Sequence, residues 1–264
     1  MRKIEVKILN PESIDQAEKL MVCAARLTQR GHQITCLDDF MGLYEKPYER
    51  STVKNLVKLP HPTIQKFSVI NVVVVGASRR FLAQITRHQN EVKYMSASLQ
   101  YSDYSGVEDF VVPYELLDSP QEEIYINQSK EAMQRYQEMV EVGVDNDSAG
   151  YCAPQGMRNI LLISATPYQW KHMIHQRTCR RNTAETRYVM LRIWEQLISQ
   201  NTELFSDCGP YCMNGICEEG KMTCGKSILP IMTVIDIIRV DFPKILDTGQ
   251  FETEEGEQHE DTAN

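Results

Sequence analysis

Three short stretches of the chain have the residue pattern of β-strands. Residues 3–9 alternate between polar and apolar side chains, which predicts an edge strand. A second strand is predicted at 65–75, where the apolar run from Val69 to Val75 is closed by Gly76. A third is predicted at 159–165. The last two runs are short and apolar, and the first of them is rich in β-branched residues, so they predict buried strands.

Apolar residues at helical spacing predict the remaining regular structure. We expect helices at about 11–28, 50–59, 78–88, 119–142 and 166–177, and another that begins near residue 182. Four of these starts have a residue suited to accept hydrogen bonds from the first turn: Asn10, Ser78, Thr166 and Asn182. Residues 145–156 contain Gly and Pro and predict a loop.

The character of the chain changes after residue 206. Gly, Pro and Cys dominate residues 207–226, an apolar segment follows at 227–251, and residues 252–264 are acidic and polar. We therefore expect a single domain at 1–206, a Cys-rich loop, a C-terminal segment that packs on the domain, and a disordered tail.

Composition narrows the class of protein. The 264 residues are 42% hydrophobic, which is ordinary for a globular protein, and the net charge of -8 argues against a partner that is a nucleic acid polymer. No apolar run approaches the ~20 residues that span a bilayer, and the N-terminus lacks the apolar core of a signal peptide. We expect a cytoplasmic protein without a membrane partner, whose eight cysteines are reduced or bind metal.

The stretch from Ser78 to Ser102 has the chemistry of a ligand site. Its predicted helix carries Gln84, Arg87 and His88 near the C-terminal end, and a loop with several hydroxyl groups follows. Arginine, histidine, amide and hydroxyl groups together suit a polyanionic ligand such as a nucleotide. The alternative is a helix end with cations against its dipole, followed by a solvated loop.

This stretch resembles the signature of the flavin-dependent thymidylate synthase family. The family motif is Arg-His-Arg, a short spacer and Ser-x-Arg-Tyr. Here the motif stands as Arg87-His88-Gln89, a spacer one residue longer, and Ser98-Leu99-Gln100-Tyr101.

Two further blocks resemble the same family. The pattern Leu-Arg, seven residues, Glu-x-Arg stands here as residues 176–187, with Gln176-Arg177 at its start and Glu185-Thr-Arg187 at its end. The pattern His-x-Thr stands as His61-Pro-Thr63. Together the blocks cover most of residues 15–200. The resemblance implies an α/β (α+β) fold with a mostly antiparallel sheet flanked by long helices, here with a Cys-rich C-terminal extension.

The resemblance also implies an activity and partners. Family members transfer a one-carbon unit to C5 of a pyrimidine nucleotide, as in the conversion of dUMP to dTMP. Methylenetetrahydrofolate donates the carbon, and FAD reduced by NADPH donates the hydride. The expected partners are therefore a pyrimidine nucleotide and folate, and the expected assembly is a homotetramer whose active sites lie between subunits.

The family's site residues are carried over by position. Arg177 would lie beside the uracil ring and stabilise its developing negative charge, which makes it the expected catalytic residue; without the family it would equally pair with Glu185. The expected cofactor-binding residues are His61, Thr63, Arg87, His88, Gln89 and His172. The expected substrate-binding residues are Gln84, Ser98, Gln100, Tyr101 and Arg177. By residue type alone, 61–63 is also consistent with a turn and His172 with a helix surface.

The chain departs from the family at positions that bind anionic groups. Gln89 replaces an arginine on the flavin side. Gln100 and Gly150 stand where the family has the two arginines that grip the nucleotide phosphate. Neutral donors replace such charge-assisted bonds poorly. Either Arg158, Arg180 or Arg181 compensates, or the substrate is a different pyrimidine.

The cysteines allow two interpretations of the C-terminal extension. Cys208, Cys212, Cys217 and Cys224 lie within 17 residues, close enough to form a tetrahedral zinc site, and free or redox-active thiols are the alternative. Cys179 is a candidate nucleophile against pyrimidine C6, because a helix start lowers a thiol pKa. The family uses no protein nucleophile.

Three functions follow from these observations. The first is a flavin-dependent thymidylate synthase, and the second is a divergent paralogue that modifies another pyrimidine or transfers another one-carbon group. The third is a non-catalytic, zinc-stabilised binding protein, which the losses at Gln89, Gln100 and Gly150 motivate. Bound flavin would separate the first two from the third.

Overall fold

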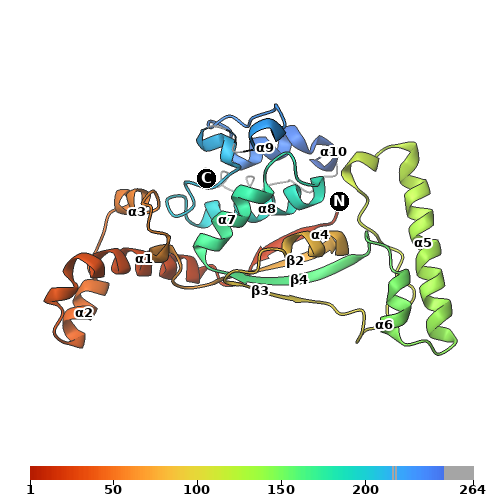
Figure 1. The fold of residues 1–264 in the computed structure, drawn as a ribbon, viewed down its shortest axis with the longest axis horizontal. Coiled ribbons are helices and arrows are strands. Elements are labelled where there is room, and N and C mark those ends of the chain that lie inside the picture. The colour runs from red at the N-terminus through yellow and green to blue at the C-terminus, as the bar shows by residue number, and fades with distance from the viewer. Residues whose placement is uncertain (216, 218, 247–264) are drawn as a thin grey trace, which may run out of the picture.

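A four-stranded antiparallel sheet forms the centre of the molecule (Figure 1). The computed structural model describes residues 1–246 except 216 and 218, so the predicted tail at 252–264 lies outside the described residues. The strands stand in the order β1-β2-β4-β3. Their bounds are β1 Glu5–Ile8, β2 Ile70–Ser78, β3 Val92–Ser96 and β4 Arg158–Ala165. The predicted sheet and its edge strand β1 are confirmed.

Strand β2 does not end at Gly76. It continues to Ser78, and the pairing with β4 shifts between Val75 and Ala77 as in a β-bulge. Gly76 has a φ of 79°, and a Cβ there would lie 2.7 Å from the carbonyl oxygen of Lys3. Only glycine fits this bulge, so Gly76 bends the strand instead of terminating it.

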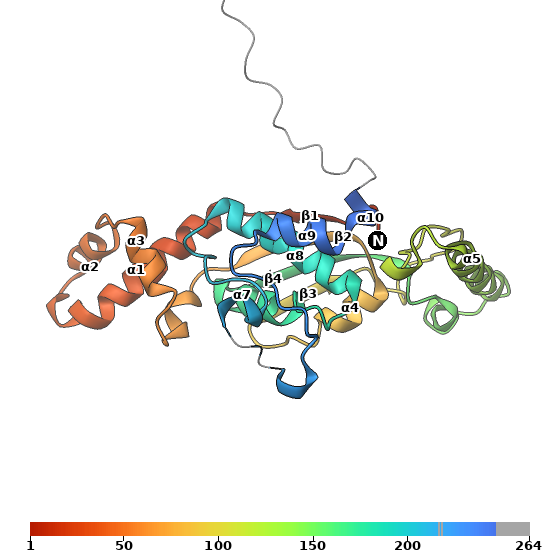
Figure 2. The same cartoon turned by 90° about the horizontal axis from the view of Figure 1, so that it is seen from above.

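Helices cover one face of the sheet (Figures 1 and 2). Those in contact with it are α4 Arg79–Ile85, α7 Pro167–Arg177 and α8 Ala184–Gln200. The C-terminal helix α9 Val234–Asp241 packs on α8, and α10 Pro243–Leu246 packs on α9. Alternate strand residues such as Val72, Val74 and Ile163 are fully buried against these helices. The indole of Trp170 packs there and donates a 3.0 Å hydrogen bond to the carbonyl oxygen of Ile70.

The opposite face of the sheet is apolar and exposed. Val75, Ile160, Leu162 and Met95 keep 36%, 53%, 39% and 71% of their accessible surface. The strand register places Met95 opposite Leu162, and Ile160 opposite Val75, so these side chains adjoin across three strands. None of the described helices lies on this side in Figure 1.

The remaining helices extend the molecule at both ends (Figures 1 and 2). One end consists of α1 Glu12–Arg30, α2 Leu37–Tyr44 and α3 Arg50–Leu56, and the other of α5 Pro120–Glu141 and α6 Asn146–Ala149. The helices α2, α6, α9 and α10 and the strand β3 were not predicted. Single 3₁₀ turns lie at Gly31–Gln33, Pro62–Gln65, Tyr114–Leu116, Gly150–Cys152, Tyr211–Asn214 and Gly220–Met222.

Two of the four predicted helix caps are confirmed. The hydroxyl of Ser78 accepts a 3.1 Å hydrogen bond from the backbone of Phe81, and Thr166 caps α7 in the same way. Asn10 and Asn182 are not caps, because α1 and α8 follow Pro11 and Thr183. The side chain of Asn10 instead bonds Ser13, Val69 and Asn71, which fixes the start of α1 against β2.

No helix in the described part of the chain is both long enough and apolar enough to span a bilayer.

Candidate functional site

Arg177 lies at the C-terminal end of α7 and joins three segments of the chain. Its Nε donates a 2.8 Å hydrogen bond to Nε2 of His88, and its terminal nitrogens donate to Oδ1 of Asn182 at 3.2 Å and to the carbonyl oxygen of Gln84 at 3.0 Å. Burial and the positive charge of Arg87 lower its pKa, yet a guanidinium remains charged at neutral pH. The cation is therefore held in one orientation.

His88 follows the end of α4 and is buried. Burial, followed by the positive charge of Arg177 and by His172, lowers its pKa to about 4. Its ring meets the edge of the His172 ring at a centroid distance of 5.8 Å. The hydroxyl of Tyr94 lies 2.8 Å from the carbonyl oxygen of His88. His88 is therefore a neutral acceptor that orients Arg177.

The alternative pairing of Arg177 with Glu185 is wrong. Glu185, at the start of α8, accepts hydrogen bonds from the backbone N–H of Ser78 at 2.6 Å and from its hydroxyl at 2.5 Å. Burial raises the pKa of Glu185, and the two bonds from Ser78 oppose this rise. The carboxylate therefore fixes the junction of β2 and α4.

The residues expected to bind flavin differ in how far they are buried. His88 is buried and His172 partly buried, whereas His61, Thr63, Arg87 and Gln89 are exposed. The prolines on either side of His61 line a cavity of about 300 Å³ together with His172. The structure therefore brings the turn at 60–63 close to α7, and it leaves Arg87 and Gln89 at the surface.

Of the residues expected to bind the nucleotide phosphate, Gln84 lies in α4 beside Arg177, and the others lie at the far end of β3. His88 precedes this strand and Ser98 follows it, and five residues of strand span about 14 Å. Gln100 and Tyr101 are exposed. Gly150 lies beside this loop, because a Cβ on it would be 3.3 Å from Cβ of Leu99. The two positions that lack the family arginines are thus neighbours.

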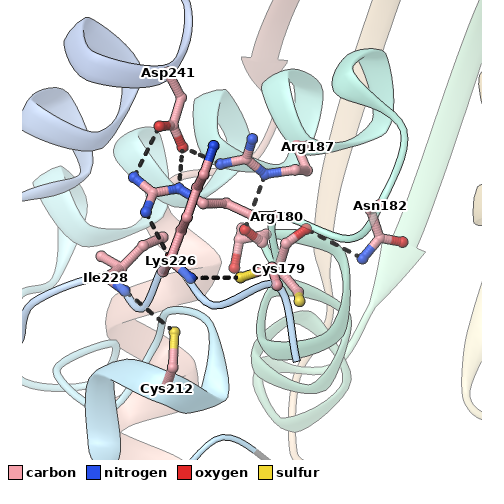
Figure 3. Close-up of polar contacts among 10 residues, drawn as sticks. Cys179, Arg180, Asn182, Arg187, Cys212, Lys226, Ile228 and Asp241 are labelled. Atoms are coloured by element: carbon pink, nitrogen blue, oxygen red, sulfur yellow. Dashed lines mark hydrogen bonds and ion pairs between the residues drawn. The ribbon is translucent and has the colours of Figure 1, made fainter. Parts of the chain in front are cut away.

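The three arginines considered as replacements are already paired. Arg158 donates to the carbonyl oxygen of Gly76 at 2.7 Å and forms an ion pair with Asp109 at 3.0 Å. Arg181 pairs with Glu219 at 2.8 Å. Arg180 donates two hydrogen bonds to Asp241, at 2.9 and 3.1 Å (Figure 3).

Asp241 also receives a hydrogen bond from Arg187, as Figure 3 shows. Burial alone would raise the pKa of Asp241, but the bonds from Arg180 and Arg187 lower it on balance. Arg187 further donates to the carbonyl oxygen of Thr178 at 3.2 Å. The final arginine of the family pattern therefore fastens α9 to the connection between α7 and α8.

The cysteines of the extension separate into two environments. Cys208 is 4% exposed within the main core. Cys212, Cys217 and Cys224 line a cavity of about 540 Å³ together with Cys179, which lies outside the extension. Among the described residues no three His, Cys, Asp or Glu side chains are already arranged to hold a metal.

Cys179 does not have the properties of a nucleophile. Burial raises the pKa of its thiol. The hydrogen bond with the Arg181 backbone opposes this rise, and Glu219, followed by Cys224 and Cys212, adds to it. The predicted lowering by a helix start is therefore wrong. The helix begins five residues later, at Ala184.

A family model and curated relatives match the chain. The model described as thymidylate synthase complementing protein matches residues 12–200. A flavin-dependent thymidylate synthase of Thermococcus onnurineus is 28% identical over an alignment 197 residues long, which covers 69% of this chain and 78% of the relative. Another, of Geobacter sulfurreducens, is 24% identical over an alignment 175 residues long, which covers 65% and 75% of the two chains.

Two solved structures share the fold. Thymidylate synthase X of Helicobacter pylori with FAD and dUMP has a TM-score of 0.59 and 17% identity, covering 78% of this chain and 98% of its own. A UMP/dUMP methylase of Streptomyces cacaoi bound with 5-bromo-dUMP has a TM-score of 0.60 and 15% identity, covering 79% and 97%.

Proposed function

Because the chain belongs to the flavin-dependent thymidylate synthase family, we propose that it converts dUMP to dTMP by methyl transfer to C5, with FAD as the redox cofactor. The observation that carries the proposal is the contact between Arg177 and His88, which unites two blocks of the family signature in one cluster. Family membership also favours an enzyme over the non-catalytic alternative.

In this proposal Arg177 binds and polarises the pyrimidine. A fixed guanidinium stabilises negative charge on a ring oxygen better than a mobile one, because no reorganisation is needed as the charge develops. The contacts with His88, Asn182 and Gln84 supply that fixation. His88 stays neutral at physiological pH, so it adds no competing positive charge.

The residues around Arg177 fit a flavin by their chemistry. Arg87 and Gln89 are exposed donors, and His172 lies against His88. Arginine suits the diphosphate of FAD, and amide and imidazole groups suit a heteroaromatic ring. Reduced FAD would supply the hydride, with NADPH as reductant and methylenetetrahydrofolate as carbon donor. We infer that Arg87, His88, Gln89 and His172, with His61 and Thr63, hold the cofactor.

We further infer that a complete site needs a second copy of the chain. Ser98 and Gln100 are separated from His88 by the length of β3, so one chain does not gather both residue sets around one small ligand. The exposed apolar sheet face, lined by Val75, Ile160, Leu162 and Met95, offers a surface for self-association. A homotetramer joined partly through this face would place the two sets in neighbouring chains.

The residues at positions 100 and 150 are a reason to compare dUMP with other pyrimidines as the substrate. Both positions lack the family's phosphate-binding arginines, and Arg158, Arg180 and Arg181 are paired within the chain. UMP, deoxyuridine and dUMP share the uracil ring and differ only in their sugar and phosphate groups. A comparison of the three therefore tests the part of the site that binds sugar and phosphate.

The activity can be tested with purified, flavin-loaded protein. Release of the C5 proton from each pyrimidine is measured with NADPH and methylenetetrahydrofolate present. We expect release from dUMP, and at least a hundredfold loss with Arg177→Ala. Bound flavin without proton release from any of the three pyrimidines would reject the proposal, whereas release from UMP alone would assign the enzyme to the paralogue.

A further inference from the structure

The cavity beside Arg177 gathers four thiols from three parts of the chain. Cys179 belongs to the connection between α7 and α8, Cys212 to the 3₁₀ turn at Tyr211–Asn214, and Cys217 and Cys224 to the loop that follows. Cys179 and Cys212 lie on opposite sides of the segment that contains Lys226 (Figure 3). Folding, not sequence spacing, brings Cys179 to this loop.

Two of the sulfurs accept backbone hydrogen bonds. The N–H of Lys226 donates to Sγ of Cys224, and the N–H of Ile228 donates to Sγ of Cys212, each at 3.4 Å (Figure 3). Between Cys224 and Lys226 stands Gly225 with a φ of 67°, a conformation that glycine adopts without strain. Hydrogen bonds to sulfur stabilise a thiolate and tune a bound metal, so this turn has the features of a metal-binding thiolate turn.

Among the described residues, positive side chains outnumber acidic ones around the cavity, where Arg177, Arg180 and Lys226 face the single lining carboxylate of Glu219. The guanidinium of Arg180 is anchored to Asp241 and to the carbonyl oxygen of Lys226, the latter at 2.6 Å. Four thiolates around a divalent cation carry a net charge of about -2. Nearby cations therefore offset the charge that such a site would introduce.

We propose that Cys179, Cys212, Cys217 and Cys224 bind one Zn²⁺ ion in a tetrahedral, structural site. Four thiolates are the preferred ligand set of structural zinc. In the described residues the sulfurs surround the cavity but are not yet in ligand geometry, and zinc requires them about 3.8 Å apart. Binding therefore contracts the loop around the ion, and its free energy stabilises the loop.

The proposed zinc ligands differ in one residue from those predicted by cysteine spacing alone. Cys208 is enclosed by the core and does not line the cavity, whereas Cys179 does. Cys179 stands two residues after Arg177, so the ion would fasten the extension to the segment that carries Arg177 and Asn182. The inference concerns metal binding only and does not depend on the proposed function.

The test begins with metal content. The full chain is purified with a thiol reductant, dialysed against a weak chelator and analysed by mass spectrometry for zinc. We expect about one zinc per chain, lost in Cys179→Ser and in Cys224→Ser and retained in the matched controls Cys208→Ala and Cys36→Ser. Absence of zinc from the wild type, or retention by Cys179→Ser with loss from Cys208→Ala, would overturn the assignment.

Cobalt provides a second measurement that needs no variant. Co²⁺ added to zinc-free wild-type protein should give the strong visible absorption of tetrahedral thiolate coordination, and alkylation should then find four fewer reactive thiols. A disulfide-linked peptide among the four cysteines of reduced, freshly purified protein would overturn the proposal. So would iron with inorganic sulfide in place of zinc, which would indicate a cluster.

Discussion

Nε of Arg177 donates a hydrogen bond to Nε2 of His88 across 89 positions of sequence. An imidazole nitrogen accepts only when it carries no proton, so the neutral His88 ring must bear its proton on Nδ1. Protonation at Nε2 would remove the acceptor and place two positive charges side by side. The orientation of Arg177 is therefore linked to the charge state of His88.

Acid should destabilise the protein through His88. The unfolded chain binds a proton near pH 6.5, whereas the folded chain does so only near pH 4, so the unfolded state holds more protons in this window and stability falls as pH falls. The loss should reach about 3 kcal/mol for this buried ring. Urea unfolding at several pH values checks it. His88→Gln should flatten the dependence and the exposed His32→Gln should not; equal slopes in all three proteins would contradict the linkage.

Asn182→Ala should lower catalytic efficiency. It removes one of the three contacts that orient Arg177, and a hydrogen bond to a charged group contributes about 1.5–3 kcal/mol. The expected fall in kcat/KM is about tenfold to a hundredfold, most of it in kcat. Steady-state kinetics measure the fall, with the exposed Asn127→Ala on α5 as the matched control. An unchanged kcat would show that His88 and Gln84 hold Arg177 without Asn182.

Arg87→Ala should yield folded protein that has lost flavin. The side chain is exposed, so its removal should change the stability of the flavin-free chain by less than about 0.5 kcal/mol. Flavin absorbance after gel filtration and the melting temperature of the flavin-free protein report the two effects separately. The control is Arg30→Ala, another exposed arginine at the end of α1. Tight flavin binding by the Arg87 variant would remove Arg87 from the cofactor site.

Gln100→Arg should tighten the binding of dUMP and leave that of deoxyuridine unchanged. The substitution restores a charge-assisted bond to phosphate, worth about 1.5–3 kcal/mol or roughly tenfold to a hundredfold in Kd. Isothermal titration of both ligands against both proteins provides the comparison. If wild-type protein already binds dUMP tightly and the substitution changes nothing, a cation other than the paired Arg158, Arg180 and Arg181 holds the phosphate.

Leu162→Asp should break the oligomer without unfolding the chain. Leu162 is 39% exposed on the bare sheet face, so a carboxylate is solvated in a single chain and buried only in an interface. Light scattering should show a lower mass than for the wild type. Val142→Asp, at the residue that follows α5, is the control at an apolar side chain that is 80% exposed and lies away from this face. Retention of the wild-type mass by Leu162→Asp would place the interface elsewhere.

The elements found from sequence were those with strong local signals. β2 has a run of β-branched residues and β4 a run of apolar ones, and Ser78 and Thr166 precede clear helical repeats. β3 was missed because Val92–Ser96 is short and includes only two strongly apolar residues. Helix α2 was missed because its N-cap residue is Cys36, a residue type that rarely caps helices. Its start is stabilised by Asp39, which accepts hydrogen bonds from the backbone N–H groups of Thr35 and Cys36.

Only those site residues that belong to family motifs could be predicted from the sequence. They identified Arg177 and His88, but the partners of each depend on packing between distant segments. The sequence pattern predicts Asn182 as a helix cap, but its side-chain oxygen accepts a hydrogen bond from Arg177. Cys208 was grouped with its sequence neighbours, although the core encloses it and Cys179 takes its place at the cavity.

The central pairing of β2 with β4 has a consequence for the order of folding. Val74 pairs with Leu161, so the middle of the sheet cannot close until more than half of the chain has been synthesised. Until then β2 has only the short β1 beside it, and its other edge is unpaired and rich in valine. Such pairing of distant segments is slow, and an open apolar edge is prone to aggregation. During synthesis on the ribosome, the unpaired edge of β2 is therefore covered only once residues 158–165 have emerged.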